Sequence, residues 1–316
     1  MSHTVLAPLD GSPLAERALP FAEALARPAG GCVVLVRAVP FLSRPAGDEP
    51  FPTLAAAQDA AAREARDYLD AVAARLAGRG VAVDVATPCE DEAEGILGEA
   101  ERRGADLIAM ATHGRGGLRR LVYGSVAEEV LARATTPTLV VRAWVPTGGA
   151  ALLGDHPRLL VPLDGSADAA AALPVAAALA DELDGTLLLM RAVARPDLAF
   201  APDLLAAPLL RQELAEERAA AEDYLRALAD RYARAGRAVE TVVRVGRPGL
   251  EMAAAVIEAV GRERGAALVV MASHRYRGLD RLLLGSVADA TLRHGTLPVL
   301  LVRPPRAPEE GGAGPA

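Results

Sequence analysis

Glycine-serine pairs that follow a polar loop at a fixed distance are the positions of this sequence with the clearest chemical potential. In the first half, the run MATHGRGG closes an apolar stretch, and nine residues separate Gly114 from the pair Gly124 and Ser125. Glycines let backbone N–H groups approach phosphate oxygens, and a serine that opens a helix lies at its partly positive amino end. The spacing predicts a phosphate cradle that needs no lysine. Ser125 and Glu128 also fit a capping box, which stabilises a helix with or without a ligand.

A carboxylate follows the first apolar run of the chain, in the segment LAPLDGSP. Asp10 comes at the end of a predicted strand, and Ser12 with Pro13 fits the N-cap and first turn of the next helix. A carboxylate at a sheet edge can accept hydrogen bonds from ribose hydroxyls. It can equally be a turn aspartate that accepts from nearby backbone amides, so both roles stay open here.

Other chemistries fit the residues less well. The chain contains no lysine, which excludes a P-loop lysine, a Schiff base and a lysine general base. The first strand is not followed by the GxGxxG fingerprint of dinucleotide-binding enzymes. His113 and His274 lack a carboxylate or serine at a defined spacing, which favours a role in orienting a loop over general base catalysis. We therefore predict no catalytic residues.

The elements that would position these residues occur twice. LAPLDGS recurs as LVPLDGS, DYL at Asp67 recurs at Asp223, and LRRLVYGSVAEEVL matches LDRLLLGSVADATL, all in the same order. The duplication predicts two domains, at 1–144 and 158–304, joined by a Pro- and Gly-containing linker at 145–157 and followed by a disordered tail at 305–316.

Each half alternates short apolar runs with longer Ala-rich helical patterns. Runs that are apolar throughout indicate strands buried on both faces, as in a parallel sheet sandwiched by helices. The predicted fold class is α/β, with two tandem doubly wound domains of five parallel strands each. In such sheets ligands lie beyond the carboxyl ends of the strands. The strands predicted in the first half are Val5–Leu9, Val33–Val39, Ala82–Ala86, Leu107–Ala111 and Thr138–Arg142.

Composition narrows the function classes further. The net charge of -7 is spread along the chain, so no basic stripe indicates a nucleic acid or an anionic membrane as partner. The apolar runs are far shorter than a membrane span. The start MSHTVLAPLD lacks the features of a secretory signal, and the two cysteines do not indicate a disulfide framework. We expect a cytoplasmic protein.

The matched blocks resemble those of universal stress proteins, and the resemblance covers both halves. Nucleotide-binding members carry a glycine, two residues, a second glycine, nine residues, and then glycine with serine or threonine; here the first glycine is Ala111. The resemblance implies a Rossmann-like domain of the adenine nucleotide alpha hydrolase-like type that binds ATP, with which Mg²⁺ could associate. The site residues that it implies in the first half are Pro8, Leu9, Asp10, Ala38, Met110, Ala111, His113, Gly114, Arg115, Gly124, Ser125 and Val126.

The second half departs from this pattern, because Arg275 stands where the central glycine is expected. Its side chain could fill the phosphate pocket or bind phosphate itself. We expect a second site that is weak, altered or plugged. The residues implied there are Pro162, Leu163, Asp164, Ala192, Met271, Ala272, Arg275, Gly285, Ser286 and Val287.

The expected function is nucleotide-dependent regulation in a stress response, with at most a slow ATP hydrolysis. A nucleotide-independent scaffold that binds an unknown protein partner is the alternative. Because universal stress domains dimerise through their last strand, the resemblance implies that the two halves pair with each other as an internal pseudo-dimer, and further homodimerisation stays open.

Overall fold

The computed structural model describes residues 3–41, 51–112, 123–145, 153–194, 206–233, 237–246, 250–273 and 284–304. The first half contains β1 (Thr4–Pro8), the 3-10 helix η1 (Ala15–Ala18), α1 (Leu19–Ala26), β2 (Cys32–Val36), α2 (Phe51–Ala77), β3 (Ala82–Ala86), α3 (Glu92–Arg103), β4 (Leu107–Thr112), α4 (Ser125–Arg133) and β5 (Thr138–Arg142). The second half contains β6 (Arg158–Leu163), α6 (Ala167–Ala170), α7 (Leu173–Glu182), β7 (Thr186–Ala194), α8 (Ala206–Tyr232), β8 (Ala238–Gly246), α9 (Leu250–Arg264), β9 (Ala266–Ala272), α10 (Ser286–His294) and β10 (Val299–Val302).

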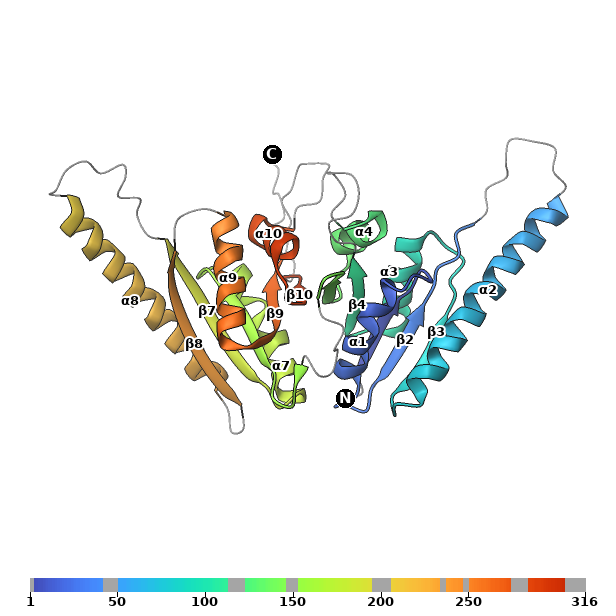
Figure 1. The fold of residues 1–316 in the computed structure, drawn as a ribbon, viewed down its shortest axis with the longest axis horizontal. Coiled ribbons are helices and arrows are strands. Elements are labelled where there is room, and N and C mark those ends of the chain that lie inside the picture. The colour runs from blue at the N-terminus through green and yellow to red at the C-terminus, as the bar shows by residue number, and fades with distance from the viewer. Residues whose placement is uncertain are drawn as a thin grey trace, which may run out of the picture.

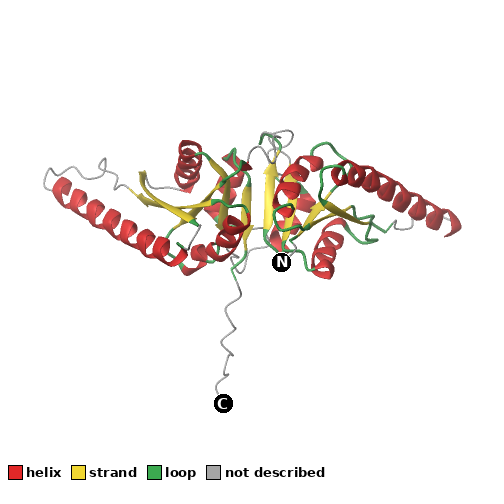
Figure 2. Cartoon of the chain, turned by 90° about the horizontal axis from the view of Figure 1, so that it is seen from below, coloured by secondary structure: helices red, strands yellow, loops and turns green. Residues whose placement is uncertain are grey.

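The described strands form one ten-stranded sheet in the order β3-β2-β1-β4-β5-β10-β9-β6-β7-β8. Within each half the strands are parallel, and the doubly wound α/β fold predicted from the sequence is confirmed. The long helices α2 and α8 lie at the two outer ends of the molecule (Figure 1). Seen from below, strands cross the middle of each half with helices on both sides (Figure 2). None of the described helices is both long and apolar enough to span a bilayer.

Small and branched aliphatic side chains build the core, as the scarcity of aromatic residues predicts. One face of the sheet packs against Leu19 of α1, Leu69 of α2 and Leu225 of α8. The other face packs against Ile96 of α3 and the buried residues of α4, α9 and α10. Because both faces are covered, strands inside the sheet such as β2 and β10 are continuous apolar runs. The edge strands β3 and β8 are less buried and carry charged residues, among them Asp84 and Arg244.

The two halves join edge to edge, since β5 pairs antiparallel with β10 in the register Leu139↔Leu300. Arg142, the last residue of β5, and Arg303, which directly follows β10, make matching contacts across the junction. Arg142, 2% exposed, donates to the carbonyl oxygen of Leu292 at the end of α10. Arg303 donates to the carbonyl oxygen of Ala134 just beyond α4, at 3.1 Å. The last carbonyls of a helix have no partner within it and carry partial negative charge, so each arginine satisfies the helix end of the other half.

The first helix begins later than the sequence predicts. Ser12 and Pro13 do not start an α-helix: the chain makes the 3-10 helix η1 and continues as α1 from Leu19. Ser12 still accepts a hydrogen bond through Oγ from the amide of Ala15, at 3.1 Å. The capping chemistry is therefore present, but it closes a tighter turn. Most of the predicted linker, at 146–152, and the predicted disordered tail, at 305–316, lie outside the described residues.

Candidate functional site

A cavity of about 440 Å³ opens in the first half at the carboxyl ends of β1, β2 and β4, beside α3 and the amino end of α4. This size is within the range of small-molecule and cofactor sites. Residues predicted from the sequence that line it are Pro8, Leu9, Asp10, Ala38, Met110, Ala111, Gly124, Ser125 and Val126. The predicted residues His113, Gly114 and Arg115 lie outside the described residues.

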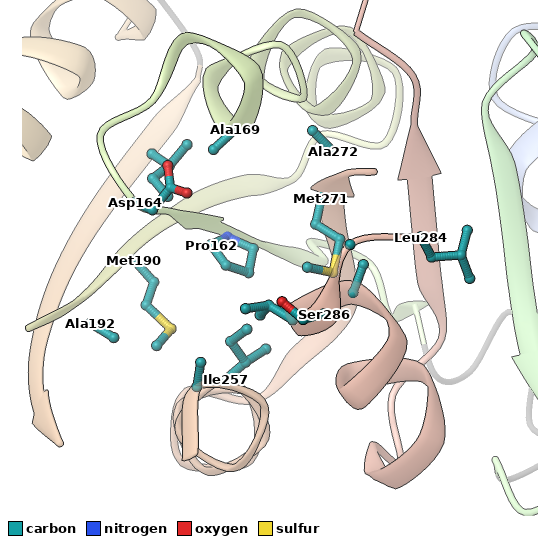
Figure 3. A pocket seen from close by; sticks show the side chains of 15 residues that line it. Pro162, Asp164, Ala169, Met190, Ala192, Ile257, Met271, Ala272, Leu284 and Ser286 are labelled. Carbon is teal, nitrogen blue, oxygen red and sulfur yellow. The ribbon is translucent and has the colours of Figure 1, made fainter. Parts of the chain in front are cut away.

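An equivalent cavity of about 320 Å³ lies in the second half. Asp164 lies on the β6 side of this space and Ile257 of α9 on the opposite side, with Met271 and Ser286 between them (Figure 3). Predicted residues that line this cavity are Pro162, Leu163, Asp164, Ala192, Met271, Ala272, Gly285, Ser286 and Val287. Arg275 is outside the part of the chain that the structure describes. The duplication has thus produced two cavities with matching walls.

Asp10 is held at the rim of the first cavity by its own turn. Its Oδ1 accepts a hydrogen bond from the amide of Ser12 at 2.8 Å, across Gly11, whose φ of +88° suits glycine. Asp164 makes the same contact with the amide of Ser166, at 2.8 Å. The turn role weighed for this aspartate is thus present. It also fixes the carboxyl group on the cavity wall, where a ligand hydroxyl could reach it.

The amino end of α4 lacks a side-chain cap, and the predicted capping box is wrong. Gly124, with φ +84°, occupies the N-cap position, which makes Ser125 the first helical residue. The amide of Glu128 donates to the carbonyl oxygen of Gly124 in the ordinary helical pattern. Gly285 caps α10 in the same way with φ +79°. Only glycine takes this backbone conformation easily. Because glycine has no side chain, it cannot cap the helix through a side-chain oxygen, but it lets a ligand come close to the backbone.

An uncapped amino end of a helix is an anion-binding element, because its first N–H groups have no partner in the helix and the helix dipole favours negative charge. In both halves this end borders the cavity, through Ser125 and Val126 in the first and Ser286 and Val287 in the second. The remaining wall is largely apolar, from proline, leucine and methionine side chains. One face of each cavity therefore suits a flat apolar group and the other suits an anion.

Some residues of the site are not evident from the sequence pattern. Glu92 and Ile96 of α3 line the first cavity, where α9 supplies Ala253 and Ile257 to the second. Helix α3 follows the edge strand β3, and no motif marks which of its faces is turned to the cavity. Tyr123 also lines the first cavity. The position of Tyr123 directly before the Gly-Ser pair is the sequence feature that could have predicted its place in the cavity.

Among the described residues no three His, Cys, Asp or Glu side chains gather into a group that could hold a metal ion. The two cysteines are free thiols. The polar and charged side chains that line the described part of the first cavity are those of Asp10, Ser12, Arg37, Glu92, Tyr123 and Ser125.

Comparison with known proteins identifies the family. The model of the universal stress protein family matches residues 1–142 and again 156–303. A universal stress protein of Mycobacterium tuberculosis is 30% identical over 201 residues, which are 63% of this chain and 62% of that protein. The chain thus spans somewhat less than two thirds of the length of such relatives. One from Thermus aquaticus is 34% identical over 143 residues, 45% of this chain and 100% of that protein.

A solved structure supports the fold. The crystal structure of a universal stress protein from Archaeoglobus fulgidus superposes with a TM-score of 0.70 at 20% identity, covering 96% of this chain and 99% of that one. Two matches to the family model, at the two cavity-bearing halves, agree with the internal duplication of sequence and structure. The chain belongs to the universal stress protein family, with two domains of that family in tandem.

Proposed function

We propose that this protein binds ATP in the cavity of its first half and uses the bound nucleotide to regulate a response to stress. The observation that carries the proposal is the glycine-capped amino end of α4, which borders a cavity of nucleotide size opposite the Asp10 carboxyl group. Family membership supports the stress-response role.

Each part of the cavity suits a part of the nucleotide. Pro8, Leu9 and Ala38 offer an apolar wall for the adenine ring. Asp10 offers a carboxylate to the ribose hydroxyls, because its turn already holds it at the rim. The free amides at the start of α4 receive the phosphates, as helix amino ends do elsewhere.

The residues at hand suit binding better than catalysis. Among the described residues, no group of His, Cys, Asp or Glu side chains that could hold a metal ion adjoins the helix end. Mg²⁺ would then come with the phosphates and be held largely by them. We propose a switch of conformation or partner that follows ATP binding, with hydrolysis slow or absent. We place this action in the cytoplasm, where Cys32 and Cys89 would stay reduced.

The test is calorimetry of ATP binding to the full chain and to Asp10→Asn. Asparagine keeps an acceptor for the Ser12 amide, so the turn survives while the charge facing the ribose is lost. Because hydrogen bonds to charged groups are worth about 1.5–3 kcal/mol, the affinity should fall about tenfold or more. Asp164→Asn makes the same change in the second half and is the matched control. ATP, ADP and AMP that all fail to bind the full chain would favour the nucleotide-independent scaffold.

A further inference from the structure

A groove of about 560 Å³ lies outside both cavities, on the second half between α8 and the turn that leads into α6. Ser166 and Ala170 line it from the turn and α6, and Tyr224, Leu228 and Arg231 line it from α8. The proposed ATP site does not use this groove.

The first half fills the same place with a carboxylate of its own. Glu16 of η1 accepts a hydrogen bond from the hydroxyl of Tyr68 at 3.0 Å and pairs with Nη2 of Arg75 at 2.6 Å. Both donors lie on α2, seven residues apart. Through these two contacts Glu16 connects α2 to the segment after β1.

The second half keeps the donors and lacks the acceptor. Aligning the repeated DYL segments places Tyr224 and Arg231 where α2 has Tyr68 and Arg75. Aligning LAPLDGS with LVPLDGS places Ala170 where η1 has Glu16. Among the described residues, no acceptor pairs with the Tyr224 hydroxyl or with the Arg231 guanidinium.

A second acidic partner has been lost at the same place. In the first half Arg37 lies over the Tyr68 ring, 5.4 Å from its centroid, and pairs with Glu64 at 3.6 Å. In the second half Arg191 lies over Tyr224 in the same way, at 5.2 Å, but Ala220 stands at the position of Glu64. The second half therefore has the two arginines and the tyrosine, but alanines stand at the positions of both carboxylates.

Asp164 does not replace the lost groups. Burial is the main cause that raises the pKa of Tyr224, and the charge of Asp164 adds to it. The matching Asp10 acts on Tyr68 in the same sense although Glu16 is present. The aspartate is thus common to both halves. The difference between them is the missing Glu16 and Glu64.

We propose that this groove binds a carboxylate from another molecule, carried on an apolar body. The carboxylate would occupy the place that Glu16 takes in the first half, between the Tyr224 hydroxyl and the Arg231 guanidinium. The apolar body would cover Leu173, Leu228 and Tyr232, which line the same groove. A carboxylate fits the donors better than a phosphate does, because one carboxylate already satisfies this pair of donors in the first half.

The groove is also linked to the second cavity. Its wall includes Gly165 and Ser166, which directly follow Asp164 of that cavity. A Cβ atom on Gly165 would lie 3.2 Å from Nη2 of Arg191, so the guanidinium is packed against this turn. A carboxylate in the groove would thus bind at the outer side of the turn whose inner side faces the second cavity.

Nuclear magnetic resonance on the ¹⁵N-labelled full chain tests the proposal, with 4-phenylbutyrate as probe and 4-phenylbutyramide as its neutral control. We expect saturable shifts at Ser166, Tyr224 and Leu228 with the acid, and at least tenfold weaker binding of the amide. Inorganic phosphate should compete poorly. The tripeptides acetyl-Leu-Glu-Leu-amide and acetyl-Leu-Gln-Leu-amide form a second pair of probes. If the acidic tripeptide binds more tightly than 4-phenylbutyrate, the ligand of the groove is a glutamate or aspartate side chain of a protein. If 4-phenylbutyrate binds more tightly, the ligand is a small organic acid.

The variant Ala170→Glu restores the carboxylate of the first half and should weaken binding of the acid about tenfold or more. Arg231→Gln should weaken it as well, while Arg226→Gln, on the same helix but outside the groove, should not. The proposal is overturned if no probe gives a saturable shift at the groove. It also fails if Ala170→Glu and Arg231→Gln both leave the binding unchanged.

Discussion

The hydroxyl of Tyr123 lies 2.8 Å from Oδ1 of Asp289 and donates to it across the junction of the two halves. Tyr123 lines the first cavity, and Asp289 belongs to α10, whose amino end borders the second. The contact has no mirror image, because Leu284 stands in the second half where the first has Tyr123. One asymmetric hydrogen bond therefore joins a residue that lines the first cavity to the helix whose amino end borders the second.

We predict that Tyr123→Phe destabilises the full chain by about 1–3 kcal/mol, since it removes a donor from a partly buried carboxylate. Asp289 keeps its ion pair with Arg293, at 2.6 Å, which limits the loss. Unfolding by urea measures the change. Tyr68→Phe removes a tyrosine-carboxylate bond inside the first half and is the matched control: it should lower stability without shifting the resonances of α10. Wild-type stability of Tyr123→Phe would contradict the prediction.

A second prediction concerns Arg142 at the end of β5 and Arg303 directly after β10. Arg142→Leu should cost more stability than Arg303→Leu, by about 1 kcal/mol or more, because Arg142 is the more deeply buried of the two. Arg142 also lies over the Trp144 ring, 4.1 Å from its centroid. Trp144 is the one tryptophan of the chain, so its fluorescence reports the junction. Equal losses in the two variants would argue against the burial difference as their cause.

The doubly wound fold was predictable because strands covered on both faces are apolar throughout, as in the predicted run Leu107–Ala111. The cavity walls were predictable too, since the carboxyl ends of neighbouring strands meet at one sheet edge. The cap at the amino end of α4 was not predictable. Ser125 has the residue type of an N-cap, but Gly124 takes that position through a positive φ that the sequence does not reveal. The pairing of β5 with β10 was predicted from the family resemblance, because the apolar pattern of β5 does not specify which strand it pairs with.

The groove beside α8 is another feature that could not be predicted from the sequence alone. Ala170 and Ala220 are ordinary helix residues when read alone. Their meaning appears only when each is placed opposite the glutamate that the first half carries there, and when the structure shows what that glutamate touches. Pairwise side-chain contacts between η1 and α2 span more than fifty residues, and no periodicity of a single segment encodes them.

A third prediction is a dependence of stability on pH through Glu99. Burial alone would raise the pKa of Glu99, but hydrogen bonds from Arg103 and Arg102 outweigh burial and hold the pKa below its usual value. A carboxyl group whose pKa is lowered in the folded state contributes stability above its unfolded pKa of about 4.3, and loses it as the pH falls through the folded value.

Glu99→Gln should therefore cost about 1.5–3 kcal/mol at neutral pH, and this cost should shrink as the pH falls below about 4. Urea unfolding at several pH values measures it. Glu101→Gln, an exposed change on the same helix, is the control and should cost little at any pH. A cost for Glu99→Gln that does not vary with pH would show that the carboxylate's charge is not what stabilises the fold.

The last prediction concerns the difference between the two cavities. Most residues of their described walls correspond, although Ala253 and Leu284 of the second cavity stand where the first has Glu92 and Tyr123. In the sequence that follows β4 and β9, Gly114 of the first half corresponds to Arg275 of the second, and both lie outside the described residues. Backbone amides can approach a phosphate only where no side chain intervenes. Gly114→Arg should therefore lower ATP affinity at the first cavity at least tenfold, and Arg275→Gly should raise it at the second.

Calorimetry of ATP binding to the full chain separates these outcomes. Gly114→Arg is combined with Asp164→Asn, and Arg275→Gly is combined with Asp10→Asn, so that ATP binding is weakened at the cavity that is not being measured. Thermal unfolding without nucleotide is the folding control. If Gly114→Arg binds ATP as the wild type does, the phosphates are held without the loop after β4. The helix amino end at Gly124 would then have to bind them without that segment.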